Sequence, residues 1–192
     1  MNISKTKKLT TISMLCALAY AAAAVGRIPL VLFLKYDPKD VIIAIGGLLF
    51  GPITSLAVTV IVSVVEMFTI SETGVFGCIM NIISSCSFAC TVASVYRKKP
   101  ELSGAASGLL CGWGCQVAVM MLWNYLIAPL YMGYPREAVV ELLLSAFLPF
   151  NLIKGGLNAV ITMLLYKPVV TALRHSHLVE SRQGSDKVHG KR

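Results

Sequence analysis

The chain has 192 residues, of which 56% are hydrophobic and only 14% are charged, and its mean hydropathy is +0.75. A soluble globular domain carries nearer a quarter charged residues, and a disordered chain needs low hydrophobicity, so the composition argues against both classes. It indicates a small integral membrane protein with a single domain. Because a helix needs about 20 residues to cross the hydrocarbon core, six crossings would use about 120 residues and leave roughly 70 for loops and ends.

The formal net charge is +8, from 17 basic and 9 acidic residues. Loops rich in lysine and arginine stay on the cytoplasmic side of a membrane, so the positions of these residues predict orientation rather than nucleic-acid binding. The basic residues gather before the first apolar stretch, after the fourth and in the tail: Lys5, Lys7, Lys8; Arg97, Lys98, Lys99; Arg174, Arg182, Lys187, Lys191 and Arg192.

The apolar stretches, taken in chain order, predict six transmembrane helices over residues 9–26, 41–50, 53–70, 75–96, 103–131 and 148–173. A polar connection follows the first stretch, and the breaker Gly51-Pro52 separates the second from the third. The second stretch is short for a span. A short helix that ends near Phe147 is expected in the connection before the last span.

The basic residues decide between five and six spans. If residues 41–70 formed one long helix, the basic N-terminus and the basic tail would lie on opposite sides of the membrane. If residues 41–70 form two spans instead, all three basic clusters lie on the same side of the membrane. We therefore expect an all-α membrane protein: a six-transmembrane-helix bundle over residues 1–173, with cytoplasmic N- and C-termini. A polar cytoplasmic tail, residues 174–192, is expected to be disordered.

Ionisable side chains inside a span are costly, so each indicates a function by default. Only Glu66 and Lys154 lie clearly within predicted spans. The predicted topology puts both in the outer half of the bilayer, together with the amides of Asn81, Asn124, Asn151 and Asn158. These six side chains come from four helices, which predicts a polar pocket that opens to the outside.

Two of these helices carry their polar residues on one face. Polar groups on such a face can have a purely structural role, in which they hold helices together. An ammonium at that depth, however, needs a partner. The partner of Lys154 is either Glu66, which would make the pair structural, or a carbonyl or hydroxyl of a ligand. The two triplets have spacings typical of one helical face: Asn151, Lys154 and Asn158 at i, i+3, i+7, and Thr59, Ser63 and Glu66 at i, i+4, i+7.

Small residues predict close helix packing at two places. Gly104, Gly108 and Gly112 form an extended GxxxG pattern for internal packing, whereas the alanine-rich face of the first span suggests a partner helix. Phosphate-loop, HExxH, CxxC and Gly-x-Ser-x-Gly motifs are absent, so no enzyme is predicted. The six cysteines lie in apolar stretches without a histidine at ligand spacing, which favours packing groups over a metal site.

Three blocks of the sequence resemble the substrate-binding (S) component of energy-coupling factor (ECF) vitamin transporters, and the riboflavin-specific group in particular. The resemblance extends from the first span to the end of the sixth. The blocks are Leu34-Lys35-Tyr36-Asp37-Pro38-Lys39-Asp40-Val41 leading to Gly46-Gly47-Leu48-Leu49-Phe50-Gly51-Pro52; Trp123-Asn124-Tyr125 with Pro129-Leu130-Tyr131; and Leu148-Pro149-Phe150-Asn151-Leu152-Ile153-Lys154-Gly155.

The resemblance implies a six-helix bundle that binds one vitamin near its outer face, with the loop between spans 1 and 2 as a lid. It implies that Asn124 and Lys154 contact riboflavin and that side chains around Lys35–Asp40 close over it. It also implies docking through first-span alanines onto a transmembrane coupling protein that carries two ATPases. Glu66 departs from the pattern, because riboflavin-specific members often have a basic residue within span 3.

We therefore predict a multi-pass protein of the bacterial cell membrane that takes up riboflavin or a related flavin, without a metal or a cofactor of its own. Two alternatives are an S component for another vitamin-like solute, and a structural or regulatory membrane protein with a buried Glu66–Lys154 pair. The predicted substrate-binding residues are Lys35, Asp37, Asp40, Glu66, Asn81, Asn124, Asn151, Lys154 and Asn158, and the predicted docking residues are Ala17, Ala21 and Ala24.

Overall fold

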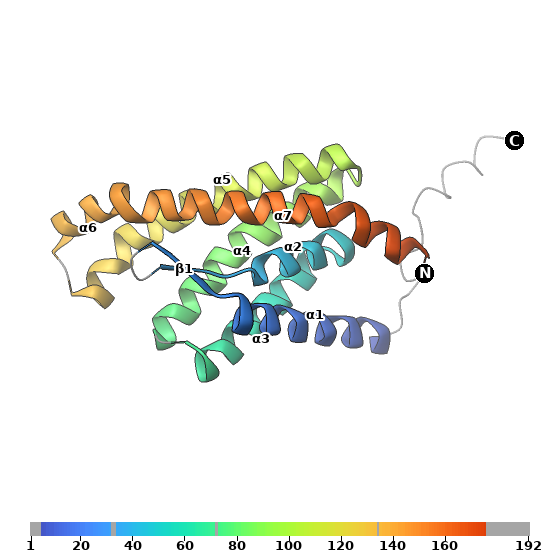
Figure 1. Ribbon diagram of the computed structural model, residues 1–192, viewed down its shortest axis with the longest axis horizontal. Helices are drawn as coiled ribbons and strands as arrows, with labels where there is room; N and C mark the ends of the chain where they lie inside the picture. The colour runs from blue at the N-terminus through green and yellow to red at the C-terminus, as the bar shows by residue number, and fades with distance from the viewer. Residues whose placement is uncertain (1–4, 32–33, 72, 134, 176–192) are drawn as a thin grey trace, which may run out of the picture.

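A computed structural model describes residues 5–31, 34–71, 73–133 and 135–175 of the chain (Figure 1). Apart from its first two residues, the tail predicted over 174–192 lies outside these ranges. The described chain is almost entirely helical. Its elements are α1 Lys5–Gly26, β1 Ile28–Val31, β2 Leu34–Tyr36, α2 Lys39–Phe50, α3 Pro52–Thr69, α4 Gly74–Lys98, α5 Leu102–Met132, α6 Arg136–Leu142, the π-helix η1 Leu143–Phe147, and α7 Leu148–His175.

All six helices expected from the apolar stretches are present, as α1 to α5 and α7. The short helix expected before the last span is α6, continued by η1 to Phe147. The sequence did not predict the antiparallel hairpin of β1 and β2, in which Ile28 faces Tyr36 and Pro29 faces Lys35. Strands of four and three residues are too short to show the alternation by which a strand is recognised.

The long helices and α2 run back and forth along the bundle, and the start of α1 and the end of α7 lie at the same end (Figure 1). Five stretches of the described residues are long and apolar enough to cross a membrane: Leu9–Gly26, Pro52–Thr69, Gly74–Lys98, Leu102–Leu130 and Arg136–Val169. The 12 residues of α2 extend only about 18 Å, less than the thickness of a hydrocarbon core.

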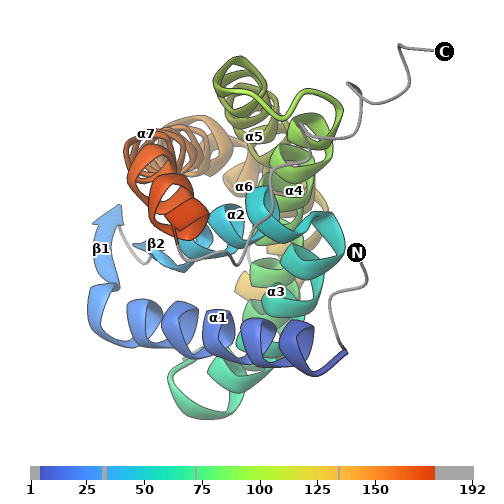
Figure 2. The same cartoon turned by 90° about the vertical axis from the view of Figure 1, so that its right-hand side faces the viewer.

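Helix α2 is short because backbone breakers bound it on both sides. Pro38 precedes it, and Gly51 ends it with φ +94°, a conformation that L side chains rarely adopt. Pro52 then begins α3, where its missing N–H costs no hydrogen bond. Viewed along the bundle, α2 lies in the middle and contacts α1, α3, α4 and α7 (Figure 2).

The apolar core joins α1 to α5 and α7 around fully buried residues such as Phe88 and Val92. The glycines of α5 permit its close contact with α4, as the GxxxG pattern predicts. A Cβ at Gly108 would lie 2.9 Å from the carbonyl oxygen of Val92, and one at Gly112 would lie 2.8 Å from that of Phe88. This rigid side of the bundle holds α4, α5 and α7 in place beside the polar cavity described next.

Candidate binding site

A cavity of about 400 Å³ lies between the hairpin end of the bundle and helices α4, α5 and α7. Its volume falls in the range of roughly 300–1,000 Å³ that is usual for small-molecule sites. Six of the nine predicted substrate-binding residues line it: Lys35, Asp37, Asn81, Asn124, Asn151 and Lys154. The other three are buried and do not line it: Asp40 and Glu66 contact lining residues, and Asn158 contacts Asp40.

The cavity wall combines an apolar surface with a polar rim. Arg27 and the α3–α4 turn residues Ser71 and Thr73 join Lys35 and Asp37 on the polar side. Aromatic and thioether side chains supply the apolar part: Phe76, Met80, Met120, Phe147 and Phe150. Such a wall suits a ligand with a flat, partly apolar ring and a polar substituent.

Two of the three cavity amides, Asn124 and Asn151, are fixed in orientation by their own helices. The Nδ2 of Asn124 donates to the Met120 carbonyl at 2.8 Å, and the Nδ2 of Asn151 donates to the Phe147 carbonyl at 2.8 Å. Because a carbonyl only accepts, these bonds leave each amide oxygen available as an acceptor. The Oδ1 of Asn124 is buried without a hydrogen-bond partner among the described residues.

Lys154 contributes the donor that complements these acceptors. Its Nζ lies 3.1 Å from the Asp40 carboxylate and donates to the Ser84 hydroxyl at 3.3 Å. The same hydroxyl accepts from Gln116 at 3.0 Å. Since an ammonium has three N–H donors, the contacts with Asp40 and Ser84 use two of them and leave one further donor at the cavity wall.

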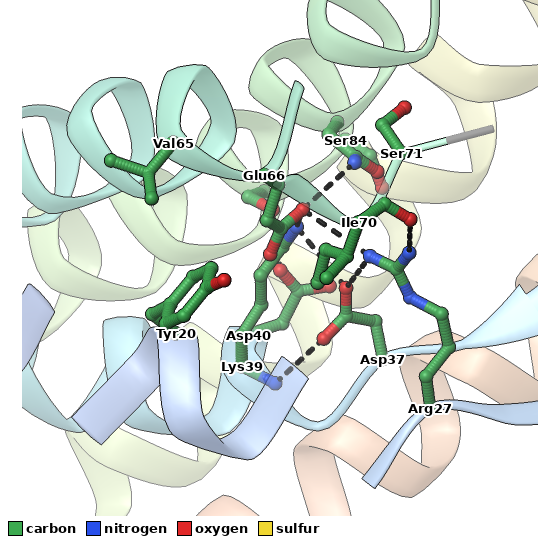
Figure 3. A network of polar contacts seen from close by, with 12 residues as sticks. Tyr20, Arg27, Asp37, Lys39, Asp40, Val65, Glu66, Ile70, Ser71 and Ser84 are labelled. Carbon is green, nitrogen blue, oxygen red and sulfur yellow. Dashed lines mark hydrogen bonds and ion pairs between the residues drawn. The ribbon is translucent and has the colours of Figure 1, made fainter. Parts of the chain in front are cut away.

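Glu66 is not the partner of Lys154, contrary to one of the alternatives drawn from the sequence. The carboxylate of Glu66 pairs with the ammonium of Lys39 and with Arg27 at 3.4 Å, and it accepts from Asn81 at 3.2 Å. Asp37 joins the same cluster through Arg27 at 3.2 Å and Lys39 at 3.1 Å (Figure 3). We call these four charged residues, Arg27, Asp37, Lys39 and Glu66, the ion-pair cluster.

The ion-pair cluster joins three parts of the chain: the end of α1, the start of α2 and the end of α3. Arg27 also donates to the carbonyl of Ile70 at 3.3 Å, so one guanidinium contacts both a carboxylate of the loop and the C-terminal end of α3 (Figure 3). Lys39 and Glu66 are fully buried, and two cations balance two carboxylates. The cluster is therefore electrically neutral despite its burial, as a buried ionic group must be.

Asp40 and Asn158 form a second layer behind Lys154. Asn158 donates to Asp40 at 3.3 Å, and it accepts from the Tyr36 hydroxyl at 3.0 Å. The hydroxyl of Ser85 also donates to Asp40. The predicted common face of Asn151, Lys154 and Asn158 is confirmed, since all three are buried, but only the first two reach the cavity.

Two ionisable groups of the hairpin and the following loop have shifted pKa values. Burial alone would raise the pKa of Asp37, but Lys39, Lys154 and Arg27 outweigh it and lower that pKa below its usual value of 3.8. Burial, with the nearby carboxylates of Asp40 and Asp37, raises the pKa of Tyr36 to about 12. Asp37 is thus charged and Tyr36 protonated at neutral pH.

The sequence did not identify several residues of the site. Arg27 is not among the predicted residues, Tyr36 and Lys39 were expected only as part of the lid segment Lys35–Asp40, and the apolar wall residues carry no signal that separates a pocket from a core. Ser84 was detectable in principle, because it follows Asn81 by three residues on the same face of α4. The long-range pairings of Arg27 and Lys39 with Glu66 depend on the hairpin, which the sequence did not reveal.

The α1 alanines divide between two faces. Ala19 and Ala23 are fully buried against the bundle. Ala17, Ala21 and Ala24, the predicted docking residues, are exposed on the outer surface. Their neighbours Leu18 and Val25 are exposed as well, so this surface is apolar and combines small alanines with larger side chains. Such a surface allows another helix to approach closely.

The fold and the cavity define a helical membrane protein built to bind a small solute. A family model of the substrate-specific component of ECF transporters matches residues 7–166, and the chain belongs to this family. It is 31% identical over 188 residues to the riboflavin transporter FmnP of Bacillus subtilis (strain 168), covering 91% of this chain and 99% of that protein.

Two further relatives agree with this assignment. The riboflavin transporter RibU of Staphylococcus aureus (strain TCH60) is 25% identical over 184 residues, which cover 91% of this chain and 96% of that protein. A solved structure of the S component of a bacterial ECF transporter superposes with a TM-score of 0.76 at 26% identity. The superposition covers 89% of this chain and 99% of that one.

Proposed function

We propose that this protein captures riboflavin at the outer face of the bacterial cell membrane and delivers it through an ATP-driven ECF coupling module. The observation that carries the proposal is the arrangement of donors and acceptors on the cavity wall. Two amide oxygens, of Asn124 and Asn151, and one ammonium, of Lys154, stand beside an aromatic and thioether surface. The flavin ring system has an apolar, aromatic body and one edge where a ring N–H stands between two carbonyls, so the N–H can donate to one of the two amide oxygens and a carbonyl can accept from the ammonium.

The polar rim supports the same ligand. The hydroxylated chain of riboflavin needs donors and acceptors outside the ring site, and Arg27, Lys35, Asp37, Ser71 and Thr73 offer both. Riboflavin transporters are also the curated relatives at 31% and 25% identity. A different vitamin-like solute with a flat ring is the second candidate, favoured only by the buried Glu66, where riboflavin-specific members often have a basic residue within span 3.

The direction of the helices supports six crossings with both termini in the cytoplasm. Five stretches are long enough to cross the membrane, and α2 runs as an additional, shorter pass between α1 and α3 (Figure 1). An even number of passes brings the start of α1 and the end of α7 to one side. With six crossings, Arg97 and Lys98 at the end of α4, and Lys99 after them, would lie on that side too, as the positive-inside rule predicts.

A riboflavin titration tests the ligand. The detergent-purified protein should quench riboflavin fluorescence with a stoichiometry near one, and Lys154→Ala should abolish the quenching. Lys167→Ala is the matched control, because Lys167 is an exposed lysine on the same helix outside the cavity, and it should bind like the wild type. A wild-type protein that ignores riboflavin would contradict the proposal, and mass spectrometry of released small molecules would then identify the ligand.

An uptake assay tests the coupling step. Ala21→Leu adds bulk to the exposed face of α1 and should leave riboflavin binding intact while it abolishes uptake by cells that contain the coupling protein and its ATPases. Ala118→Leu is the control, because Ala118 is an exposed alanine on α5. Equal uptake by both variants would contradict docking through Ala17, Ala21 and Ala24.

A further inference from the structure

A chain of buried hydrogen bonds leads from the cavity wall to the hairpin. It begins at the Lys154 ammonium, 3.1 Å from Oδ2 of Asp40. The same oxygen accepts from Nδ2 of Asn158 at 3.3 Å, and Oδ1 of Asn158 accepts from the hydroxyl of Tyr36 at 3.0 Å. Helices α7 and α2 supply the middle of the chain, and Tyr36 is the last residue of β2.

Each link has a fixed direction. Tyr36 has a pKa of about 12, so its hydroxyl keeps its proton and donates. That bond requires the oxygen of the Asn158 amide to face the hairpin, which leaves the amino group to face Asp40. The carboxylate of Asp40 also accepts a hydrogen bond from Ser85, and it forms an ion pair with the oppositely charged Lys154.

The chain is protected from solvent over its whole length. Asp40 and Asn158 are fully buried, while Tyr36 is 6% exposed and Lys154 5%. None of the three residues behind Lys154 lines the cavity, so they act on a ligand only through the lysine or through the hairpin. When one hydrogen bond of a buried chain is lost, a polar group is left without a partner, which is costly away from water. Each hydrogen bond of the chain therefore depends on the others.

We propose that Asp40 and Asn158 are positioning residues that hold Lys154 in its ligand-binding orientation and fasten the β1–β2 hairpin to it through Tyr36. The inference rests on the proposed function, since it concerns retention of the ligand that Lys154 binds. A ligand on Lys154 lies beside a hairpin whose position is set by the same hydrogen-bonded chain. The fastening lowers the rate of ligand dissociation and has little influence on the rate of association.

Stopped-flow fluorescence with riboflavin tests the fastening in the full-length, detergent-purified protein. Tyr36→Phe removes one hydroxyl and should speed riboflavin dissociation about three- to tenfold, as expected for one hydrogen bond, with association changed less than about twofold. Asn158→Leu should have a similar effect. The double variant should be no faster than the faster single variant, because both cut the same chain.

Tyr166→Phe provides a matched control. Tyr166, on α7, is buried like Tyr36 but lies outside the cavity. Its hydroxyl lies 2.8 Å from that of Tyr96, so the substitution removes an equivalent hydrogen bond. Dissociation from Tyr166→Phe should stay at the wild-type rate. Equal acceleration by this control would overturn the inference in favour of a general loosening of the bundle.

The outcomes separate this inference from the proposed function. If the wild type binds riboflavin and Tyr36→Phe releases it at the wild-type rate, the fastening is wrong and the riboflavin assignment stands. If Tyr36→Phe does not fold, the rate of Asn158→Leu decides in the same way. If the wild type does not bind riboflavin, the proposed function fails first, and the inference about retention fails with it.

Discussion

Lys39 and Lys154 are two buried lysines at the same end of the bundle, and their surroundings differ in one decisive respect. Lys39 is enclosed by two carboxylates, Asp37 and Glu66, and does not reach the cavity. Lys154 has one carboxylate and one hydroxyl as partners, and it lines the cavity. The comparison teaches that burial of a charge inside a membrane bundle does not by itself mark a binding residue. We expect a binding residue to be one that still has a free hydrogen-bond donor or acceptor after its structural bonds are made.

The largest effect should come from Lys154→Met. The substitution removes the donor for the ligand and leaves Asp40 buried without its cation, a loss of about 3–5 kcal/mol for a buried pair. We expect no measurable riboflavin binding and a lower melting temperature in detergent. Asp40→Asn combined with Lys154→Met should restore the melting temperature in part and leave binding absent. A double variant that binds riboflavin would contradict a direct role for the ammonium.

Lys39→Met should affect stability rather than recognition. Arg27 still neutralises part of the charge on Asp37 and Glu66, so we expect a smaller loss, about 2–3 kcal/mol, than for a pair left wholly unpaired. The folded fraction should bind riboflavin within about tenfold of the wild type. Thermal unfolding followed by titration of the folded protein checks both parts. A selective loss of binding with unchanged stability would break the contrast between the two lysines.

Asp37→Asn should lower the stability least, because Glu66 still pairs with both Lys39 and Arg27, and that effect should depend on pH. The pKa of Asp37 in the folded protein lies below its usual 3.8. Its stabilising charge is therefore fully present above pH 3.8 and is lost as the pH falls through the lower folded-state value. The difference in melting temperature between Asp37→Asn and the ligand-free wild type should shrink below pH 4. A difference that is constant with pH would exclude a role for the Asp37 charge.

The sequence predicted the helices because their apolar stretches are long and end at strong breakers such as Gly51-Pro52. It also predicted that Asn124, Asn151 and Lys154 come together, because helical spacing and the alternation of spans fix which ends of helices are neighbours. It did not predict the hairpin, whose strands are too short to show a pattern.

The pairing of the charges could not be read from the sequence either. Asp37, Asp40 and Glu66 all lie at the same end of the bundle as Lys154, and helical spacing does not choose between Glu66 and Asp40 as its partner. The choice follows from the place of α2 at the middle of the bundle (Figure 2). There Asp40 pairs with Lys154 of α7, and Lys39 pairs with Glu66 of α3. That placement depends on tertiary packing, and so does the burial of Arg27 against the end of α3.

A side-by-side riboflavin titration of the wild type, Lys39→Met and Lys154→Met tests the central claim most directly. All three proteins should be measured on the folded, monodisperse fraction at the same pH. The account predicts quenching with the wild type and with Lys39→Met, and none with Lys154→Met. Quenching by Lys154→Met that equals the wild type would contradict a riboflavin site built around that ammonium.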